Sequence, residues 1–316
     1  MARLAIITDM CRRRGWWGQW PDAKTTTGEA VCVVETVYLN GSFIPYSEAL
    51  VPFEDRGMLF ADGIYEVVRA YDGRFFALEG HLQRLVASAQ EIQLEVPPVE
   101  ELQEAIQGVM ERSGLHDTSI YLQVTRGFAG ARSHGIPHGI RPTVFAAARP
   151  VPRPDPRHVA EGATAITVPD RRWHMCHVKS IGLLLNNLAK QAALDAGAQE
   201  ALFVREGVLT EGAATNAFAV FDGEVWTHPE GHLVLSGITR QVVIELAHAE
   251  GLTVREEPYQ ASRMYGAQEV FVTSTNLEVL PIRAIDGRSI GSGVPGAVTR
   301  RLQAAFTRRT SALAAV

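Results

Sequence analysis

The sequence predicts a soluble α+β protein of two domains, and three observations favour that class. At 316 residues the chain is longer than one typical hydrophobic core requires. Alternating, strand-like runs and helix-spaced runs occur in both halves. Between them lies a proline-rich stretch, residues 149–156, whose composition is typical of a stiff linker. We therefore expect a small α/β domain at residues 36–149, a linker at 150–157 and a larger domain at 158–316.

The first residues of the chain differ in composition from the rest. They hold three consecutive arginines from Arg12, a pair of tryptophans at Trp16 and a run of threonines from Thr25. Such a segment could bind a partner, or it could come from a misplaced translation start. We interpret residues 1–35 as a disordered extension.

The small domain should begin with a hairpin. Asn40-Gly41 is a strong hairpin signal, and it separates the apolar residues 37–39 from 42–45. The segment 64–71 alternates like a strand and turns at Asp72-Gly73. The elements expected after this turn are a return strand at 74–76, helices at 78–92 and 99–113, a strand at 119–125, a long loop at 126–142 and a strand at 144–148.

The larger domain should combine several short strands with three helices. Gly197 is expected to end the first helix, and a glycine turn at Gly237 to open the second. The expected strands are 163–168, 201–204, 208–210, 217–221, 224–227 and 269–273, and the expected helices are 181–196, 237–250 and 297–307.

Composition excludes several classes of function. The net charge of −5 provides no broad basic surface, so nucleic acid is not expected as the main partner. No apolar run approaches the roughly 20 residues that a transmembrane helix needs, so no membrane partner is expected. Three cysteines are too few for a disulfide framework and suit a reducing cytoplasm.

Lysine is nearly absent from the chain. Of the 30 basic residues only Lys24, Lys179 and Lys190 are lysines. A primary amine can lose its proton and attack a carbonyl carbon, which a guanidinium cannot do. Lys179 is therefore a candidate for Schiff-base chemistry, although scarcity alone fits an ordinary surface lysine equally well.

Several short motifs match by chance. Residues 287–291 have the spacing of a nucleophile elbow but lack the strand and helix that such an elbow joins. His228 and His232 have the spacing of a zinc helix, but Pro229 and Gly231 between them are incompatible with a helix. We expect no metal site.

A Schiff-base lysine that works with pyridoxal 5′-phosphate needs two further groups. The phosphate requires backbone donors at a helix N-terminus, and residues 237–240 (GITR) and the hydroxyls of Ser274-Thr275 could supply them. The pyridine nitrogen requires a carboxylate, and Glu211 stands at a predicted strand end. Each feature alone has a simpler explanation, but together they favour a cofactor site.

From about residue 37 to 306 the chain resembles the fold-type IV pyridoxal-phosphate aminotransferases. The resemblance lies in residues 55–69 (DRGMLFADGIYEVVR), 81–85 (HLQRL), 178–180 (VKS), 209–212 (LTEG), 236–240 (SGITR) and 271–275 (FVTST). It implies a large cofactor-binding domain with a mixed, largely antiparallel sheet or barrel flanked by helices. It also implies that Lys179 forms the Schiff base and carries the Cα proton, that Glu211 pairs with the pyridine nitrogen, and that four residues hold the phosphate: Arg84, Ile238, Thr239 and Thr275.

Within this family the chain is most similar to D-amino acid (D-alanine) aminotransferases. There a strand tyrosine and an Arg-x-His pair on a long loop bind the substrate carboxylate, and this chain has Tyr65, Arg132 and His134. The resemblance implies D-alanine:2-oxoglutarate aminotransferase activity by ping-pong chemistry. The substrates would be D-alanine or D-glutamate and 2-oxo acids such as 2-oxoglutarate and pyruvate.

The same resemblance implies a homodimer in which this loop reaches the neighbouring subunit's active site. The alternatives are an L-branched-chain aminotransferase, an aminodeoxychorismate-type lyase, or a cofactor-binding scaffold without turnover. Ala213-Ala214 stands where relatives often carry serines, which is the main support for the last of these.

Overall fold

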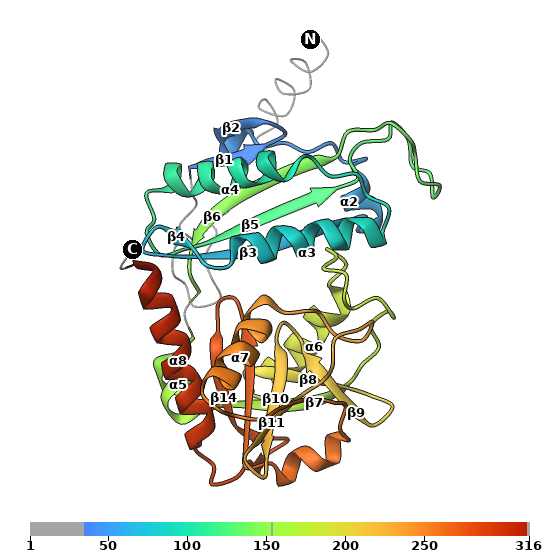
Figure 1. Ribbon diagram of the computed structural model, residues 1–316. Coiled ribbons are helices and arrows are strands. Elements are labelled where there is room, and N and C mark those ends of the chain that lie inside the picture. Colours follow the sequence, from blue (N-terminus) through green and yellow to red (C-terminus); the bar gives the residue numbers. More distant parts are fainter. Residues whose placement is uncertain (1–34, 153, 315–316) are drawn as a thin grey trace. The chain divides into compact units, whose positions relative to one another are not determined.

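The computed structural model of the protein describes residues 35–152 and 154–314 (Figure 1). Of the predicted extension, residues 1–35, only Glu35 lies within the described part. The described residues from Glu35 onward form one compact unit. The described elements form two sheets with helices packed against them, and the α+β class is confirmed (Figure 1).

The first sheet has six strands in the order β2-β1-β6-β5-β3-β4, and every neighbouring pair is antiparallel. The predicted hairpin at Asn40-Gly41 is confirmed, and both residues have positive φ, as a tight two-residue turn requires. The strands are β1 (Thr36–Leu39), β2 (Ser42–Pro45), β3 (Gly63–Tyr71), β4 (Arg74–Phe75), β5 (Thr118–Thr125) and β6 (Thr143–Pro150).

Two helices, α3 (Leu78–Glu91) and α4 (Val99–Ser113), lie across one face of this sheet (Figure 1). Alternate residues of β3, such as Ile64 and Val68, point into this face and are fully buried. They pack against helix residues one turn apart, including Leu82 and Leu85. The shorter helices of this part are η1 (Tyr46–Glu48) and α2 (Arg56–Phe60).

The second sheet has nine strands in the order β12-β11-β10-β13-β14-β7-β8-β9, with β15 paired to β14. Five neighbouring pairs are antiparallel and three are parallel, so the predicted mixed, largely antiparallel sheet is confirmed. The strands are β7 (Ala163–Pro169), β8 (Glu200–Arg205), β9 (Val208–Gly212), β10 (Asn216–Phe221), β11 (Glu224–Thr227), β12 (Val254–Glu256), β13 (Glu269–Ser274), β14 (Glu278–Ile285) and β15 (Arg288–Ser289).

The helices α7 (Ile238–Ala249) and α8 (Ala297–Ala314) flank this second sheet (Figure 1). Val243 of α7 and Leu302 of α8 share a buried cluster with Phe218 and Phe271 of the sheet. Helix α6 (Leu184–Asp195) packs on β8 through alanines, so its backbone lies close to the strand. The remaining short helices are α5 (Pro156–Glu161) and η2 (Ala261–Gly266).

The structure corrects several predicted boundaries. Helix α6 begins at Leu184 rather than residue 181, and α8 continues to Ala314 rather than residue 307. Strand β14 was not predicted because it contains Pro281, which has no N–H for a sheet ladder. The pairing of β14 with β7 begins only at Ile282, so no hydrogen bond to β7 is lost.

The stretch expected to be a linker at 150–157 is shorter in the structure. Strand β6 continues through Pro150 and α5 begins at Pro156. The division of the chain into domains at this stretch stays a prediction. Side chains of the two sheet regions meet directly, because the Tyr71 hydroxyl donates to Glu278 Oε1 at 3.0 Å.

Within residues 35–152 and 154–314, no helix combines the length and the apolar character that a membrane crossing requires.

Candidate active site

A cavity of about 370 Å³ lies around Lys179, where the loop between β7 and α6 passes the end of β3. Its size is within the range of small-molecule sites in enzymes. Of the residues predicted for the site, Arg132 and His134 do not line this cavity. The other predicted residues all line it: Tyr65, Arg84, Lys179, Glu211, Ile238, Thr239 and Thr275.

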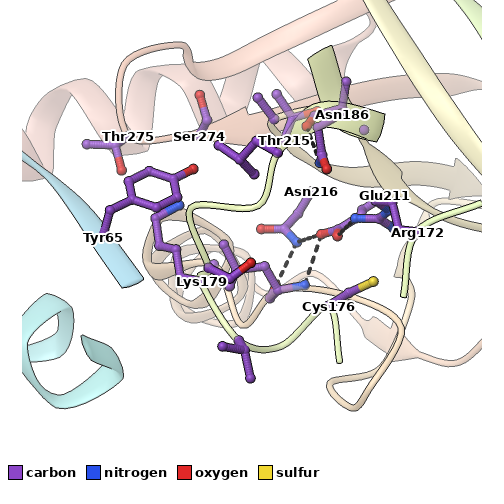
Figure 2. Close-up of a pocket in the computed structure, with 18 of the residues that line it drawn as sticks. Tyr65, Arg172, Cys176, Lys179, Asn186, Glu211, Thr215, Asn216, Ser274 and Thr275 are labelled. Atoms are coloured by element: carbon purple, nitrogen blue, oxygen red, sulfur yellow. Dashed lines mark hydrogen bonds and ion pairs between the residues drawn. The ribbon is translucent and has the colours of Figure 1, made fainter. Parts of the chain in front are cut away.

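The backbone of Lys179 is fixed from two sides. Its carbonyl oxygen accepts a hydrogen bond from the Tyr65 amide at 3.0 Å, and its own amide donates to Ser88 Oγ on α3 at 3.2 Å. The lysine nitrogen Nζ lies 4.2 Å from the centre of the Tyr65 ring (Figure 2). Among the described residues no carboxylate or carbonyl pairs with this amine, so its lone pair is available for reaction once a proton is lost.

Glu211 accepts hydrogen bonds from three donors. Its Oε1 receives Arg172 Nη1 at 2.5 Å, and its Oε2 receives Asn216 Nδ2 at 3.1 Å and the Leu235 amide at 3.0 Å (Figure 2). A carboxylate offers about four lone-pair positions, so one acceptor position remains on this cavity-lining residue. Glu211 is therefore held as a buried acceptor that can receive one more N–H.

Arg172 belongs to a buried chain of alternating charges that the sequence analysis did not identify. Its Nη2 lies 2.9 Å from Asp170, which also pairs with Arg205 at 3.1 Å. Burial raises the pKa of Glu211, and the nearby Arg172 guanidinium opposes that rise. The only sequence signal was the pair of opposite charges two residues apart at the end of β7, which is common on protein surfaces.

Arg84 is also held by a partner that the sequence analysis missed. Its Nε and Nη2 each donate to Glu66 at 2.7 Å, and its Nη1 donates to the Ser236 carbonyl at 2.8 Å. Glu66 also lies 2.8 Å from His81 Nδ1. Despite its burial, the Arg84 charge and the hydrogen bonds from Arg84 and His81 lower the pKa of Glu66, so the carboxylate stays ionised. Arg84 is thus held at the edge of the cavity with N–H groups still free.

The N-terminus of α7 supplies donors for an anion. The first amides of a helix have no partner within it, and Gly237 at this N-cap has no side chain to satisfy them. Ile238 and Thr239 carry these amides and line the cavity. Figure 2 shows Ser274 and Thr275 on the opposite side of the cavity from Glu211. The nearby Thr273 hydroxyl is buried with no hydrogen-bond partner, which fits a polar ligand at this end.

Cys176 also lines the cavity but is not a nucleophile at neutral pH. Burial raises the pKa of its thiol to about 11, and the thiol donates to the Trp173 carbonyl at 3.2 Å. In the part of the chain that the structure describes, no group of three or more His, Cys, Asp and Glu side chains is arranged to hold a metal ion.

Arg132 and His134 lie outside the cavity, on the loop between β5 and β6. The Arg132 guanidinium is 5.1 Å from the centre of the Phe60 ring, and the His134 ring is 5.5 Å from it. The structure therefore brings these two side chains together, but not with Lys179 of the same chain.

Comparison with known proteins places this geometry in a family. A sequence profile described as amino-transferase class IV matches residues 63–285. The chain belongs to the class IV aminotransferases. The matched region includes Lys179 and the buried Glu211. It also includes the four residues that could hold a phosphate, which we call the anion cradle: Arg84, Ile238, Thr239 and Thr275. It ends before α8, so that helix is not part of the family match.

This aminotransferase is similar to several curated enzymes. It is 41% identical over 274 residues to a D-alanine aminotransferase of Staphylococcus haemolyticus, covering 86% of this chain and 96% of that protein. It is 42% identical over 273 residues to one of Listeria monocytogenes, covering 85% of this chain and 94% of the other. The transaminase activity of the family and its substrate classes, amino acids and 2-oxo acids, follow from these relatives.

Solved structures of branched-chain amino acid aminotransferases have the same fold. The aminotransferase matches the Escherichia coli enzyme with a TM-score of 0.82 and 29% identity, covering 87% of this chain and 94% of that one. It matches a second such enzyme, determined with pyridoxamine 5′-phosphate, with a TM-score of 0.83 and 31% identity, covering 89% and 95%. Pyridoxal 5′-phosphate is the cofactor of this family, and the residues around Lys179 fit it.

Proposed function

We propose that this protein is a D-amino acid aminotransferase that transfers the amino group of D-alanine or D-glutamate to 2-oxo acids such as 2-oxoglutarate and pyruvate. The observation that carries the proposal is one cavity in which an unpaired lysine amine lies between a buried carboxylate and an anion cradle. The D-amino acid subclass is supported by the curated D-alanine aminotransferases and by the Arg132–His134 pair.

Each end of the cofactor has matching residues. Arg84, the amides of Ile238 and Thr239, and the Thr275 hydroxyl would hold the phosphate. Glu211 would accept the pyridine N–H at its remaining lone pair. When bound, pyridoxal 5′-phosphate supplies an electron-withdrawing ring that stabilises negative charge at the substrate Cα. The Arg172 guanidinium behind Glu211 opposes the rise in the pKa of this carboxylate that burial causes.

Lys179 would carry the proton that moves during the reaction. Its amine must exchange with the substrate amine and then take the Cα proton, so Nζ has to pass between neutral and charged forms. The Tyr65 ring lies 4.2 Å from Nζ, at a distance that suits a cation–π contact with a lysine ammonium. The Ser88 and Tyr65 contacts to the lysine backbone hold Nζ on one side of the cavity, which would set the face of the substrate that exchanges its proton.

We further propose that the enzyme acts as a homodimer in the cytoplasm. Arg132 and His134 do not line the cavity of their own chain, so they would serve the neighbouring subunit's site. Several large apolar side chains are exposed and suit burial against a second copy: Leu50, Phe53, Met58, Leu184 and Leu188. The one cysteine in the described residues is a free thiol, as a reducing compartment allows.

A stereochemical assay tests the function. With 2-oxoglutarate as acceptor, we expect amino transfer from D-alanine at a kcat/KM at least about tenfold above that from L-leucine. Product formation would be followed as pyruvate and as glutamate of determined configuration. Preference for L-leucine would instead support the branched-chain alternative, which the similarity to branched-chain enzymes of known structure favours. Bound cofactor with no transfer from either donor would support the scaffold.

Replacing Arg132 by alanine should weaken substrate binding but leave the cofactor in place. A guanidinium–carboxylate contact contributes about 1.5–3 kcal/mol, so the KM for D-alanine should rise roughly tenfold to a hundredfold. The visible absorption of the cofactor-loaded protein should stay unchanged, because Arg132 is not among the residues proposed to hold the cofactor. An unchanged KM would remove the carboxylate-binding role of this loop.

The two alanines at 213 and 214 do not by themselves argue for an inactive protein. The turn that they occupy is held by backbone contacts, since the Gly212 amide donates to the Thr215 carbonyl at 2.7 Å. The Ala213 carbonyl accepts from Asn186 Nδ2 at 2.8 Å. The loop shape is therefore maintained without serine hydroxyls.

A further inference from the structure

The loop that carries Arg132 and His134 is closed at its neck by contacts within its own chain. Asp55, the residue before α2, pairs with Phe128 in an isolated bridge and accepts a hydrogen bond from Thr143 at 2.6 Å. Gly127 has φ of +93°, and a Cβ there would lie 2.0 Å from the Arg141 carbonyl oxygen. The two ends of the loop thus approach each other as closely as backbone allows, which only glycine permits.

The carboxylate of Asp62 connects the base of the loop, at Arg126, with Arg56, which binds the tip of the loop at residues 133–135. Its Oδ2 accepts from Arg126 Nε at 2.8 Å and from Arg56 Nε at 2.7 Å. Burial opposes ionisation of Asp62, but the hydrogen bonds from the two guanidiniums outweigh it and hold its pKa below the usual range. Arg126 then donates to the Gln93 carbonyl at 2.6 Å, which attaches the loop base to the end of α3.

Arg56 binds the backbone at the tip of the loop, residues 133–135. Its Nη1 donates to the Ser133 carbonyl at 2.6 Å and to the Gly135 carbonyl at 3.2 Å. These two carbonyls stand on either side of His134. Arg56 is 5% exposed, so water competes little for these hydrogen bonds.

The Phe60 ring lies close to Arg56 of α2 and to Arg132 and His134 of the loop. Arg56 lies 4.8 Å from its centre, Arg132 5.1 Å and the His134 ring 5.5 Å. Within the described part of the chain Arg132 has no carboxylate partner, so its five N–H groups are not committed to another anion. The ring can hold the guanidinium in place and still leave its edge free for a ligand. Figure 1 shows this loop beside α2, which carries both Arg56 and Phe60.

We propose that Arg56 and Phe60 are positioning residues that preorganise Arg132 and His134 for a substrate carboxylate. We call Arg56, Phe60 and Asp62 the loop cradle. The inference rests on the proposed function, because it takes Arg132 and His134 to bind that carboxylate. The cradle touches no reacting atom. It lowers the cost of ordering two side chains each time a carboxylate binds, which preserves affinity.

Phe60→Leu and Phe60→Tyr in the cofactor-loaded full chain test the cradle. Leucine keeps the apolar volume but removes the ring, so the KM for D-alanine should rise about fivefold with kcat nearly unchanged. The affinity for propionate, which has the carboxylate but no amine, should fall by a similar factor in calorimetric titration. Phe60→Tyr keeps the ring face and should restore both values.

Phe43→Leu is a matched control in the same sheet region. Arg112 lies 3.8 Å from the centre of the Phe43 ring, so this variant also loses a cation–π contact, far from the loop. It should change the melting temperature as Phe60→Leu does, without changing the KM or the propionate affinity. If Phe60→Leu behaves like Phe43→Leu, Phe60 is only structural and the inference is overturned.

Arg132→Ala separates the inference from the function on which it rests. If Arg132→Ala leaves the KM unchanged, the carboxylate-binding role of the loop is wrong, whatever Phe60→Leu does. If Arg132→Ala raises the KM but Phe60→Leu does not, the loop binds the carboxylate and the cradle does not position it. In the double variant the effect of Phe60→Leu should be smaller than in the otherwise unchanged protein, because only His134 remains to be positioned.

Discussion

Replacing Lys179 by alanine is expected to abolish amino transfer, with kcat falling by roughly four orders of magnitude or more. The reason is that this amine is proposed both to link to the cofactor and to move the substrate proton. The other described lysine of the cavity, Lys190, donates its amine to the Gln199 carbonyl instead. The visible absorption band of the cofactor-loaded protein should disappear with the covalent link. The measurements are absorbance after reconstitution with pyridoxal 5′-phosphate and turnover with D-alanine and 2-oxoglutarate.

Two further variants separate the amine from its charge. Lys179→Arg keeps a cation above the Tyr65 ring but cannot lose a proton, so it should be as inactive as Lys179→Ala. Lys190→Arg changes the other lysine of the described chain, which also lines the cavity. Its ammonium donates to the Gln199 carbonyl, which an arginine can also do, so this variant should keep both band and turnover. Retained turnover in Lys179→Arg would mean that the residue acts by charge alone.

Replacing Glu211 by glutamine is expected to have the second-largest effect, on both stability and kcat. Three donors surround this carboxylate, and the glutamine amide has only one acceptor oxygen, so one donor must face its NH2 group. We expect cofactor-free protein to lose about 2 kcal/mol of stability. We also expect kcat to fall about a hundredfold to a thousandfold, because a neutral group cannot hold the proton on the pyridine nitrogen.

Glu200→Gln provides the comparison for Glu211→Gln. Glu200 is a buried glutamate behind the same turn, where it accepts from the Ala201 amide at 2.8 Å and from Thr215 at 3.1 Å, and it does not line the cavity. Burial raises the pKa of Glu200 as it raises that of Glu211, so the two glutamates are matched in this respect and differ in that only Glu211 lines the cavity. The melting temperature and kcat would be measured for both variants. An equal fall in kcat would show that Glu211 contributes to folding rather than to protonation of the cofactor's pyridine ring.

Much of this site could be predicted because its reactive groups are rare or lie in ordered motifs. Lys179 stands out in a chain with 27 arginines among 30 basic residues. Its partners are harder to predict, because pairing across elements leaves no trace in local periodicity. Arg84 has the helix position of a surface arginine, and only the fold brings Glu66 of β3 beneath it.

The same limit applies to the fold. Proline is unusual inside a strand because it has no N–H to donate, yet β14 contains Pro281. The structure accommodates this proline because the pairing of β14 with β7 begins at the next residue, Ile282. The start of α6 was misplaced because residues 181–183 have the apolar character of the helix. They are instead part of the loop that crosses the end of β3, where the Ile181 amide donates to the Gly63 carbonyl at 3.1 Å. Such tertiary contacts decide boundaries that sequence patterns leave open.

Arg84 and Ser88 lie one helical turn apart on the same face of α3, about 6 Å along its axis. Arg84 carries the guanidinium that is proposed to bind the phosphate, and Ser88 accepts a hydrogen bond from the backbone amide of Lys179. Helix α3 would therefore set the distance between the two residues that are proposed to hold the cofactor, Arg84 and Lys179. A single residue inserted between Arg84 and Ser88 would turn one contact about 100° away from the cavity. Length changes in homologous chains should consequently fall outside this turn, whatever substrate those chains take.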